Sequence, residues 1–285
     1  MQYQSPASID EAVAALASIG GARILAGGTD LLVQLRSGAA SPAAVIDIKN
    51  IDAMRAITET GEGFRIGAAA CGAEITDHAA LVRAWPGVAE AAGLIGSTQV
   101  QGRASLGGNV CNASPAADTT PALIAARAVA EIVGPNGRRA IPVEQIATGP
   151  GKTSLAPGEI VVSFLLPKPA GRAADAYLRL IPRTEMDIAV AGAAVNLTLN
   201  TDGTIADARV AIGAVAPTAL VLDAAPGILA GNRPDEAILA KLADAASALA
   251  MPIDDKRGTT DYRRKVVGVL AKRAALIAYE RAGAR

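Results

Sequence analysis

The spacing of apolar residues in the first forty positions changes from helical to strand-like. One helical face is formed by Ile9, Ala12, Val13 and Leu16. Ser8 and Glu11 have the spacing of a capping box at the start of this helix. The apolar run 23–26 predicts a strand, and a second apolar run ending at Leu35 predicts a short helix. The chain therefore begins with a helix, a strand, a glycine turn and a short helix.

The pattern continues as strands interspersed with helices up to about residue 165. Strands are predicted at 45–48, 64–68, 130–134 and 159–164, and helices at 74–82, 87–95 and 122–128. For the last of these helices, Thr120 is the expected N-cap and Pro121 the first helical residue.

A proline-rich segment, Pro167 to Arg172, predicts a linker and a domain boundary. Beyond it, 191–199 and 205–215 have strand composition, and Asp202-Gly203 is a hairpin-turn signal between them. Two helices should follow, starting near Pro234 and Thr260. The fold class is therefore α+β, with one domain at 1–170, itself divided near residue 52, and another at 171–285.

The 27 basic and 27 acidic residues balance, so the net charge favours neither nucleic acid nor an anionic membrane as a partner. The longest uncharged apolar stretch, Val210 to Leu222, contains Pro217 and is too short to span a bilayer. The N-terminal residues lack the pattern of a secretory signal. We therefore expect no transmembrane segment and a cytoplasmic location.

Few residues are suited to bind a metal. Cys71 and Cys111 are far apart and do not form a CxxC motif, so they are expected to be small buried hydrophobes in a reducing compartment. His78, the only histidine, is expected at the start of a helix and not as a point of covalent flavin attachment. No metal site is predicted in this chain.

Two motifs with adjacent glycines have the character of anion-binding loops. The first is Gly27-Gly28-Thr29-Asp30, between a strand and a helix, and the second is the stretch 105–118, which contains Gly107-Gly108-Asn109. Adjacent glycines allow positive φ and let backbone N–H groups approach an anion. The spacing is not the GxGxxG of a dinucleotide-binding Rossmann fold, which argues against a nicotinamide dehydrogenase core.

Together these motifs resemble those of one family. The segment 26–31 (AGGTDL) is similar to one phosphate loop of the FAD-binding medium subunits of molybdenum hydroxylases, the group that includes carbon monoxide dehydrogenase and xanthine dehydrogenase flavoproteins. The segment 105–109 (SLGGN), followed by Ala113-Ser114-Pro115 and Asp118, is similar to the other. The resemblance covers essentially the whole chain.

The resemblance implies an FAD-binding domain of the vanillyl-alcohol oxidase/CO dehydrogenase flavoprotein (PCMH) type, with the pyrophosphate between the two loops. It also implies a C-terminal domain made of an antiparallel sheet with helices. The implied FAD-binding residues are Ile24, Leu25, Ala26, Gly27, Gly28, Thr29, Asp30, Leu31, Ile95, Val100, Ser105, Leu106, Gly107, Gly108, Asn109, Asn112, Asp118, Val161 and Arg179.

Particular roles follow for some of these residues. The pyrophosphate charge should be carried by the backbone N–H groups of residues 27–29 and 107–109. A carboxylate suits a helix start better than a phosphate site, so Asp30 is expected to cap the following helix. Arg179 would place a positive charge near the flavin, where it would favour the anionic reduced form; the alternative is a surface charge. For Asp118 the alternative is a simple helix-start residue.

The resemblance implies an oxidoreductase subunit with no catalytic side chain of its own. FAD would pass electrons from [2Fe–2S] clusters on a small partner subunit to NAD, oxygen or a quinone, and a large partner subunit would carry molybdopterin-Mo. The implied assembly is a dimer of heterotrimers. Two alternatives are a free-standing FAD oxidoreductase of the UDP-N-acetylenolpyruvoylglucosamine reductase type and a non-catalytic assembly subunit.

Overall fold

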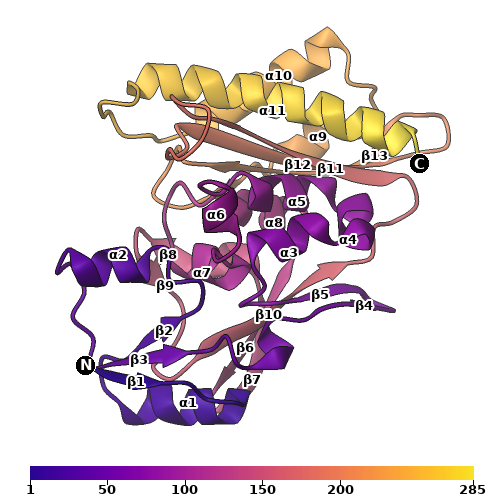
Figure 1. Ribbon diagram of the computed structural model, residues 1–285. Helices are drawn as coiled ribbons and strands as arrows, with labels where there is room; N and C mark the ends of the chain where they lie inside the picture. The colour runs from indigo at the N-terminus through magenta and orange to yellow at the C-terminus, as the bar shows by residue number, and fades with distance from the viewer.

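The computed structural model describes all residues, 1–285, and its N-terminal part is a small parallel sheet flanked by helices. Its strands are β1 (Gln2–Gln4), β3 (Ala44–Asp47) and β2 (Arg23–Leu25), in that spatial order. The helices of this part are α1 (Ile9–Ser18) and α2 (Leu31–Arg36). α2 buries none of its residues, so it contributes little to the core and lies at the edge of the molecule (Figure 1).

A five-stranded antiparallel sheet follows. Its spatial order is β4 (Ile57–Thr60), β5 (Gly63–Gly67), β10 (Ile160–Pro167), β6 (Val129–Gly134) and β7 (Gly137–Pro142). The short 3-10 helices η1 (Asp52–Met54) and η2 (Val143–Gln145) and the hairpin β8 (Ala147–Gly149) and β9 (Lys152–Thr153) lie in the connections. Between β5 and β6 the chain forms the helices α3 (Gly72–Asp77), α4 (Ala79–Ala84), α5 (Pro86–Gly93), α6 (Thr98–Gln101), α7 (Leu106–Cys111) and α8 (Thr119–Ala125).

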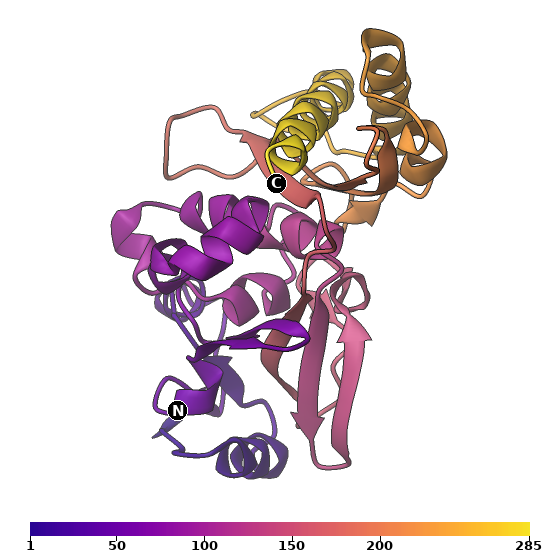
Figure 2. The same ribbon diagram turned by 90° about the vertical axis from the view of Figure 1, so that its right-hand side faces the viewer.

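The C-terminal part is a four-stranded antiparallel sheet with three helices. Its strands are β11 (Ala173–Leu180), β12 (Ala191–Leu199), β13 (Ile205–Gly213) and β14 (Leu220–Val221), and its helices are α9 (Ala225–Leu229), α10 (Glu236–Leu249) and α11 (Thr260–Gly283). α11 packs on one face of this sheet, while α5 and α8 lie against the other (Figures 1 and 2). Eight of the nine residues of β12 are buried as a result.

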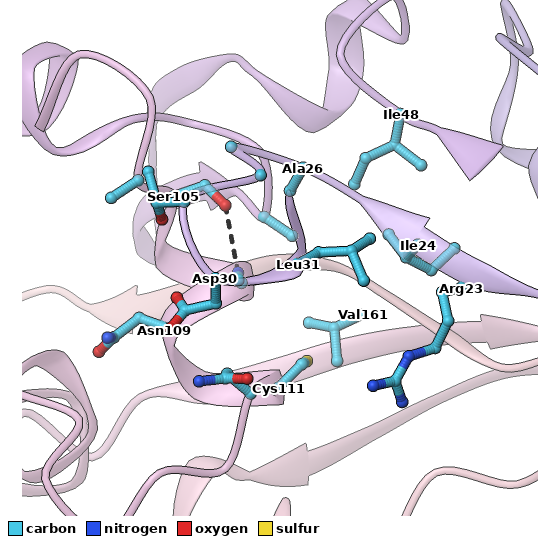
Figure 3. A pocket seen from close by; sticks show the side chains of 18 of the residues that line it. Arg23, Ile24, Ala26, Asp30, Leu31, Ile48, Ser105, Asn109, Cys111 and Val161 are labelled. Carbon is cyan, nitrogen blue, oxygen red and sulfur yellow. Dashed lines mark hydrogen bonds between the residues drawn. The ribbon is translucent and has the colours of Figure 1, made fainter. Parts of the chain in front are cut away.

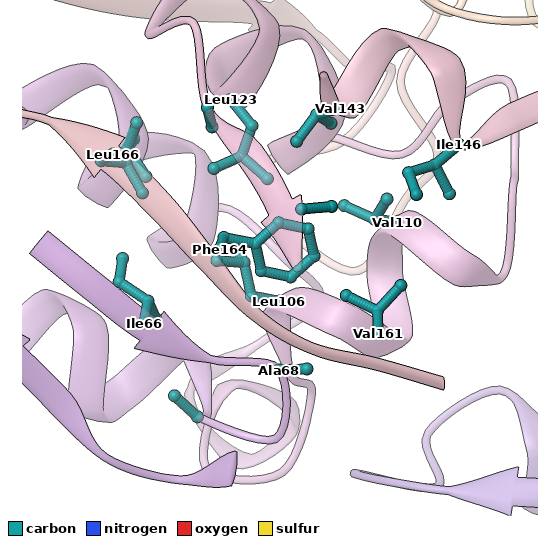
Figure 4. Packing of buried hydrophobic residues seen from close by; sticks show 14 of the residues in the cluster. Ile66, Ala68, Leu106, Val110, Leu123, Val143, Ile146, Val161, Phe164 and Leu166 are labelled. Carbon is teal, nitrogen blue, oxygen red and sulfur yellow. The ribbon is translucent and has the colours of Figure 1, made fainter. Parts of the chain in front are cut away.

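Phe164 of β10 lies at the centre of the N-terminal core. Leu106 and Val110 of α7 point toward it, and Ile66 of β5 and Leu123 of α8 pack around it (Figure 4). All five side chains are at most 1% exposed. Each such burial contributes about 1.5–3 kcal/mol relative to an exposed side chain. This packing fixes α7, and with it the second glycine motif, against the five-stranded sheet.

Polar contacts join the C-terminal sheet to the helices beneath it. The carboxylate of Asp175, on β11, accepts hydrogen bonds from the backbone N–H groups of Gly87 (3.0 Å) and Val88 (3.1 Å), at the start of α5. Arg281 of α11 pairs with Glu90 of α5 and donates to the carbonyl of Asp175. The start of α5 is thus capped by a residue of the C-terminal sheet, which sets the position of one part on the other.

The architecture confirms the predicted α+β class and most predicted elements. Ser8 accepts a hydrogen bond from the N–H of Glu11, as expected for a helix cap, although the Glu11 carboxylate bonds the N–H of Ala7 instead of that of Ser8. The turn at Gly203, with φ of +84°, closes the predicted hairpin. Strand β11 was not predicted because Asp175 and Arg179 interrupt its apolar pattern.

One predicted helix start is wrong. α8 begins at Thr119 and ends at Ala125, so Thr120 is a helical residue and Pro121 occupies the third position. The start is set by Asn109 of α7, whose Oδ1 accepts hydrogen bonds from the N–H (3.2 Å) and the hydroxyl (2.6 Å) of Thr119. Sequence spacing could not show this cap, because it comes from a neighbouring helix.

The helices of the structure are either too short or too polar to cross a membrane. The longest, α11, carries charged residues along its length.

The buried carboxyl at the α5 start makes stability depend on pH. Burial raises the pKa of Asp175 from its ordinary 3.8 to about 7, against the opposing effect of the hydrogen bonds from α5. A carboxyl that is protonated in the folded chain and ionised in the unfolded chain lowers stability as pH rises. The free energy of unfolding should therefore decrease between about pH 4 and pH 7 and level off above that range.

Asp175→Asn should remove this contribution. The free energy of unfolding of the variant minus that of the wild type should increase by roughly 1–3 kcal/mol from pH 5 to pH 8, since one pKa unit corresponds to about 1.4 kcal/mol. Urea unfolding at several pH values measures the difference, with the exposed Asp244→Asn as control. A stability difference that is the same at pH 5 and pH 8 would contradict the assignment.

Candidate cofactor-binding site

A cavity of about 300 Å³ lies where the first glycine loop, α7 and β10 meet. Figure 3 shows Ala26 and Asp30 on the loop side, Asn109 and Cys111 on α7, and Val161 on β10. This volume is at the lower end of the range for small-molecule sites. Because its walls come from both N-terminal sheets, the cavity exists only when the two sheets are packed together.

The first glycine loop presents a row of unpartnered backbone donors. Within the chain, none of the N–H groups of residues 26–31 donates a hydrogen bond. Gly28 has φ of +79°, a left-handed conformation that favours glycine. Successive N–H groups in such a turn form a nest that binds anions. The loop therefore has the donor set expected for a phosphate site.

The second glycine motif is a helix start and not a loop, which corrects the sequence interpretation. Leu106–Cys111 form α7, and Ser105 is its N-cap. The N–H of Leu106 bonds the carbonyl of Ala70, and that of Gly107 bonds the carbonyl of Ala68. The remaining N–H groups of the first turn bond the Ser105 hydroxyl and carbonyl. The expectation that the N–H groups of residues 107–109 carry the pyrophosphate is therefore wrong, because Ala68 and Ser105 already accept their hydrogen bonds.

The glycines of both motifs allow close backbone packing. A Cβ on Gly107 would lie 2.7 Å from both the Cβ and the carbonyl oxygen of Ala68, so glycine lets α7 rest on the end of β5. A Cβ on Gly27 would lie 1.8 Å from the carbonyl oxygen of Arg103. The first loop therefore rests against the backbone just before α7. Gly27 thus brings the first motif against the residues that precede the second.

Asp30 does not cap α2, contrary to the sequence expectation. Its backbone has helical dihedrals (φ −99°, ψ −50°), whereas a capping residue needs extended ones, and its carboxylate makes no capping hydrogen bond. The side chain instead lines the cavity. Desolvation by the surrounding walls raises the pKa of its carboxyl. A negative charge thus stands next to the row of N–H groups.

Two other charged residues line the cavity. Arg23 of β2 lies at one end, and its Nη2 is 3.4 Å from Oε1 of Gln34. Glu159 is held by two hydrogen bonds from Arg139, of 2.7 and 2.6 Å, which lower the pKa of Glu159. Burial raises the pKa of the Cys111 thiol to about 12, so this wall group is neutral. The cavity therefore contains no nucleophile and no paired acid and base.

Most of the residues implied by the resemblance meet at this cavity. It is lined by Ile24, Ala26, Gly27, Gly28, Thr29, Asp30, Leu31, Ile95, Ser105, Gly107, Gly108, Asn109, Asn112 and Val161. It is not lined by Leu25, Val100, Leu106, Asp118 or Arg179. Ten further lining residues were not predicted: Arg23, Gln34, Ile48, Ala68, Ala104, Cys111, Gly151, Leu155, Glu159 and Ile160. Arg23, Ala104, Cys111 and Ile160 adjoin predicted residues, which is the one signal that could have found them.

Asp118 and Arg179 form a separate buried cluster. Arg179 Nη1 is 2.6 Å from Asp118 Oδ2, and the Tyr177 hydroxyl donates to Asp118 Oδ1 at 2.8 Å. Arg179 also donates to the carbonyl of Leu94, next to the lining residue Ile95. The Arg179 side chain is 5% exposed, so the surface-charge alternative is wrong. Asp118 stands at the N-cap position of α8, as its helix-start alternative expected, but its carboxylate makes no capping hydrogen bond and pairs with Arg179 and Tyr177 instead.

The single histidine is structural. Nδ1 of His78 accepts a hydrogen bond from the N–H of Leu81 at 3.2 Å, which caps α4. Its ring meets the edge of Phe64 at 5.9 Å between centroids. This confirms its predicted position at a helix start, away from the residues that line the cavity.

Family models match nearly the whole chain. Residues 1–169 match a family described as "FAD binding domain in molybdopterin dehydrogenase". Residues 176–278 match "CO dehydrogenase flavoprotein C-terminal domain". The first match covers both N-terminal sheets and every residue that lines the cavity.

Individual relatives also match this chain over nearly its full length. The carbon monoxide dehydrogenase medium chain of Hydrogenophaga pseudoflava is 35% identical over 281 residues, which cover 98% of this chain and 97% of the relative. The xanthine dehydrogenase FAD-binding subunit of Escherichia coli O157:H7 is 30% identical, with 99% and 97% covered.

A solved structure of the H. pseudoflava enzyme, a form that lacks the Mo-pyranopterin moiety of the molybdenum cofactor, matches with a TM-score of 0.94 at 36% identity, covering 99% of this chain and 98% of that one.

The fold and cavity define an α+β protein with a cavity between two packed sheets whose unpartnered N–H groups suit a phosphate-containing cofactor. The chain belongs to the family of FAD-binding medium subunits of molybdenum hydroxylases, which are oxidoreductases. The sequence-based predictions of family, fold class and FAD as cofactor are thereby confirmed.

The contact of Gly27 with Arg103 can be tested through stability. Gly27→Ala forces its Cβ into a backbone carbonyl that cannot move independently, so the variant should lose about 1–3 kcal/mol of unfolding free energy, as overpacked sites do. Gly20→Ala is the control, because a Cβ there meets nothing within 4 Å. Urea unfolding of the FAD-free proteins measures both, and equal stability of the two variants would contradict the packing.

Proposed function

We propose that this chain is the FAD-binding subunit of a multi-subunit molybdenum hydroxylase. In this proposal electrons reach its FAD from [2Fe–2S] clusters on a small partner subunit and leave for NAD, oxygen or a quinone. A large partner subunit would carry molybdopterin-Mo, in a dimer of heterotrimers located in the cytoplasm. The observation that carries the proposal is the row of unpartnered N–H groups at residues 26–31, within a sequence that matches the FAD-binding family model.

The residues present fit the diphosphate of FAD. The loop offers donors without a protein partner, and Asn109 adds its Nδ2, since its Oδ1 is occupied by Thr119. Neutral dipoles and one flanking arginine, Arg23, would carry the anion, with no cluster of basic side chains. Gly107 and Gly108 would serve as a close wall, because their N–H groups are already bonded.

The other proposed FAD-binding residues have two kinds of position. Ile24, Leu31, Ile95 and Val161 line the cavity, where their apolar surface would contact the cofactor. We propose that the cluster of Asp118, Tyr177 and Arg179 acts from behind this wall, since Arg179 holds the carbonyl next to Ile95. A division of the chain at residues 170 and 171 is supported by the loop that separates β10 from β11.

The cavity favours electron transfer over substrate chemistry by this chain. Bound FAD supplies one- and two-electron transfer, and the protein supplies orientation and electrostatics. No acid/base pair lines the cavity, because Glu159 is bonded to Arg139 and the Cys111 thiol is neutral. A free-standing flavoenzyme would need such groups near its flavin. The structure therefore supports the subunit function over that alternative.

Native size-exclusion chromatography with metal and flavin analysis tests the proposal. The chain should elute in a complex several times its own mass of 28.6 kDa, together with molybdenum, iron and FAD. Elution alone with FAD and no metal would overturn the subunit assignment in favour of a free-standing flavoenzyme. Elution in a complex without flavin would favour a non-catalytic assembly subunit.

The carboxylate of Asp30 should weaken FAD binding as pH rises. The pKa of this carboxyl is raised in the folded chain, and a nearby diphosphate would raise it further. FAD affinity should therefore fall as pH increases and the carboxyl loses its proton. Asp30→Asn should remove this dependence and bind FAD roughly threefold or more tightly at pH 8, because a like charge in the site is lost.

Fluorescence titration with FAD from pH 5 to pH 8 measures the effect. Asp52→Asn, which removes a carboxylate of the same domain that does not line the cavity, is the control. If Asp30→Asn and the wild type show the same pH dependence, Asp30 does not face the diphosphate.

A further inference from the structure

A chain of polar contacts crosses the N-terminal sheet and ends at the first glycine loop. Lys49, just beyond β3, donates from its Nζ to the carbonyl of Ala26 at 3.1 Å. The same Nζ lies 2.7 Å from Oδ1 of Asp47. The hydroxyl of Tyr3, on β1, donates to Oδ2 of Asp47 at 2.8 Å. Side chains of β1 and β3 are thus linked, through Lys49, to the loop that follows β2.

The contact at Ala26 fixes the direction of the next N–H group. The carbonyl of Ala26 and the N–H of Gly27 belong to one peptide unit, and the chain contains no cis peptide. In a trans peptide these two groups point in opposite directions. Lys49 does not line the cavity, whereas Ala26 and Gly27 do. A carbonyl held by Lys49 therefore turns the Gly27 N–H toward the cavity.

The loop is held from two sides at this point. Lys49 bonds the carbonyl that precedes Gly27, and the Arg103 carbonyl lies against the α-carbon of Gly27. Oδ1 of Asp47 also accepts a hydrogen bond from the backbone N–H of Lys49 at 3.0 Å, so the same oxygen holds both the backbone and the ammonium group of Lys49. The Lys49 side chain is 27% exposed and that of Asp47 10%. The pair is therefore partly shielded from water.

The ammonium acts through geometry more than through long-range charge. Asp47 neutralises Lys49 at contact distance, and a neutral pair has a weak field beyond a few ångström. Burial of the Asp47 carboxyl opposes its ionisation, but the hydrogen bonds from Lys49 and Tyr3 outweigh this and lower its pKa. The ion pair is thus present at neutral pH.

We propose that Lys49, held by Asp47 and Tyr3, is a positioning residue that orients the Ala26–Gly27 peptide so that the loop N–H groups meet a bound diphosphate. The inference rests on the proposed FAD function, since it concerns the same loop. Lys49 would not touch the cofactor, and it is not among the FAD-binding residues that the family resemblance implies.

The test compares FAD binding by Lys49→Met, Lys49→Arg and the wild type in fluorescence titrations. Lys49→Met keeps the aliphatic stem but loses the donor, and should bind FAD about tenfold more weakly, which corresponds to about 1.4 kcal/mol. Lys49→Arg keeps a cationic donor and should recover most of the affinity. Lys272→Met is the matched control, since Lys272 is 29% exposed and pairs with Glu236 on the C-terminal helices.

A second measurement separates positioning from general support of the fold. Competition with FAD gives the affinities of ADP and adenosine, whose ratio reports the contribution of the diphosphate. Lys49→Met should lower this ratio, whereas a merely structural role would weaken both ligands equally. Equal weakening of ADP and adenosine, or FAD affinity within about twofold of the wild type, would overturn the proposal for Lys49 and leave the proposed FAD function intact. If the wild-type chain binds neither FAD nor ADP, both the proposal for Lys49 and the proposed FAD function are wrong.

Discussion

The site depends on one constraint, which is that buried backbone donors must find partners. At α7 the chain meets this need itself, because the carbonyls of Ala68 and Ala70 and the side chain of Ser105 satisfy the first turn. At residues 26–31, most of which are only partly buried, it does not, and the N–H groups have no partner within the chain. The two glycine motifs therefore differ in function. One presents donors to a ligand, and the other provides a rigid wall against which that ligand can rest.

The rigid wall and the donor loop come from different sheets, so their separation depends on how the sheets pack. Gly27 against the Arg103 backbone sets the distance between them, and Phe164 with its neighbours holds α7 in place. The polar residues of β11 then join the C-terminal sheet to α5 and to the segment before Ile95. Apart from Gly27, the residues that make these contacts do not line the cavity, yet they contribute to its shape.

The sequence predicted the class, most strands and the segments that form the cavity, because those depend on local patterns and on motif spacing. It failed where a partner distant in sequence decides the outcome. Asn109, and not Thr120, sets the start of α8. The charged residues of β11 interrupt the apolar pattern of a strand that is mostly buried. Asp30 looked like a helix cap, but its helical backbone turns the carboxylate away from that role. The glycines of α7 looked like a loop because sequence does not show that Ala68 packs against them.

The burial of both faces of the C-terminal sheet also bears on how the chain folds. β12 has almost no solvent-exposed residue, and the face toward α5 and α8 is covered only by the N-terminal part. Made alone, the C-terminal segment would expose that apolar face to water and to other copies of itself. During synthesis the N-terminal helices emerge first and can serve as the surface on which this sheet assembles. The C-terminal sheet therefore cannot readily be exchanged as an independent module.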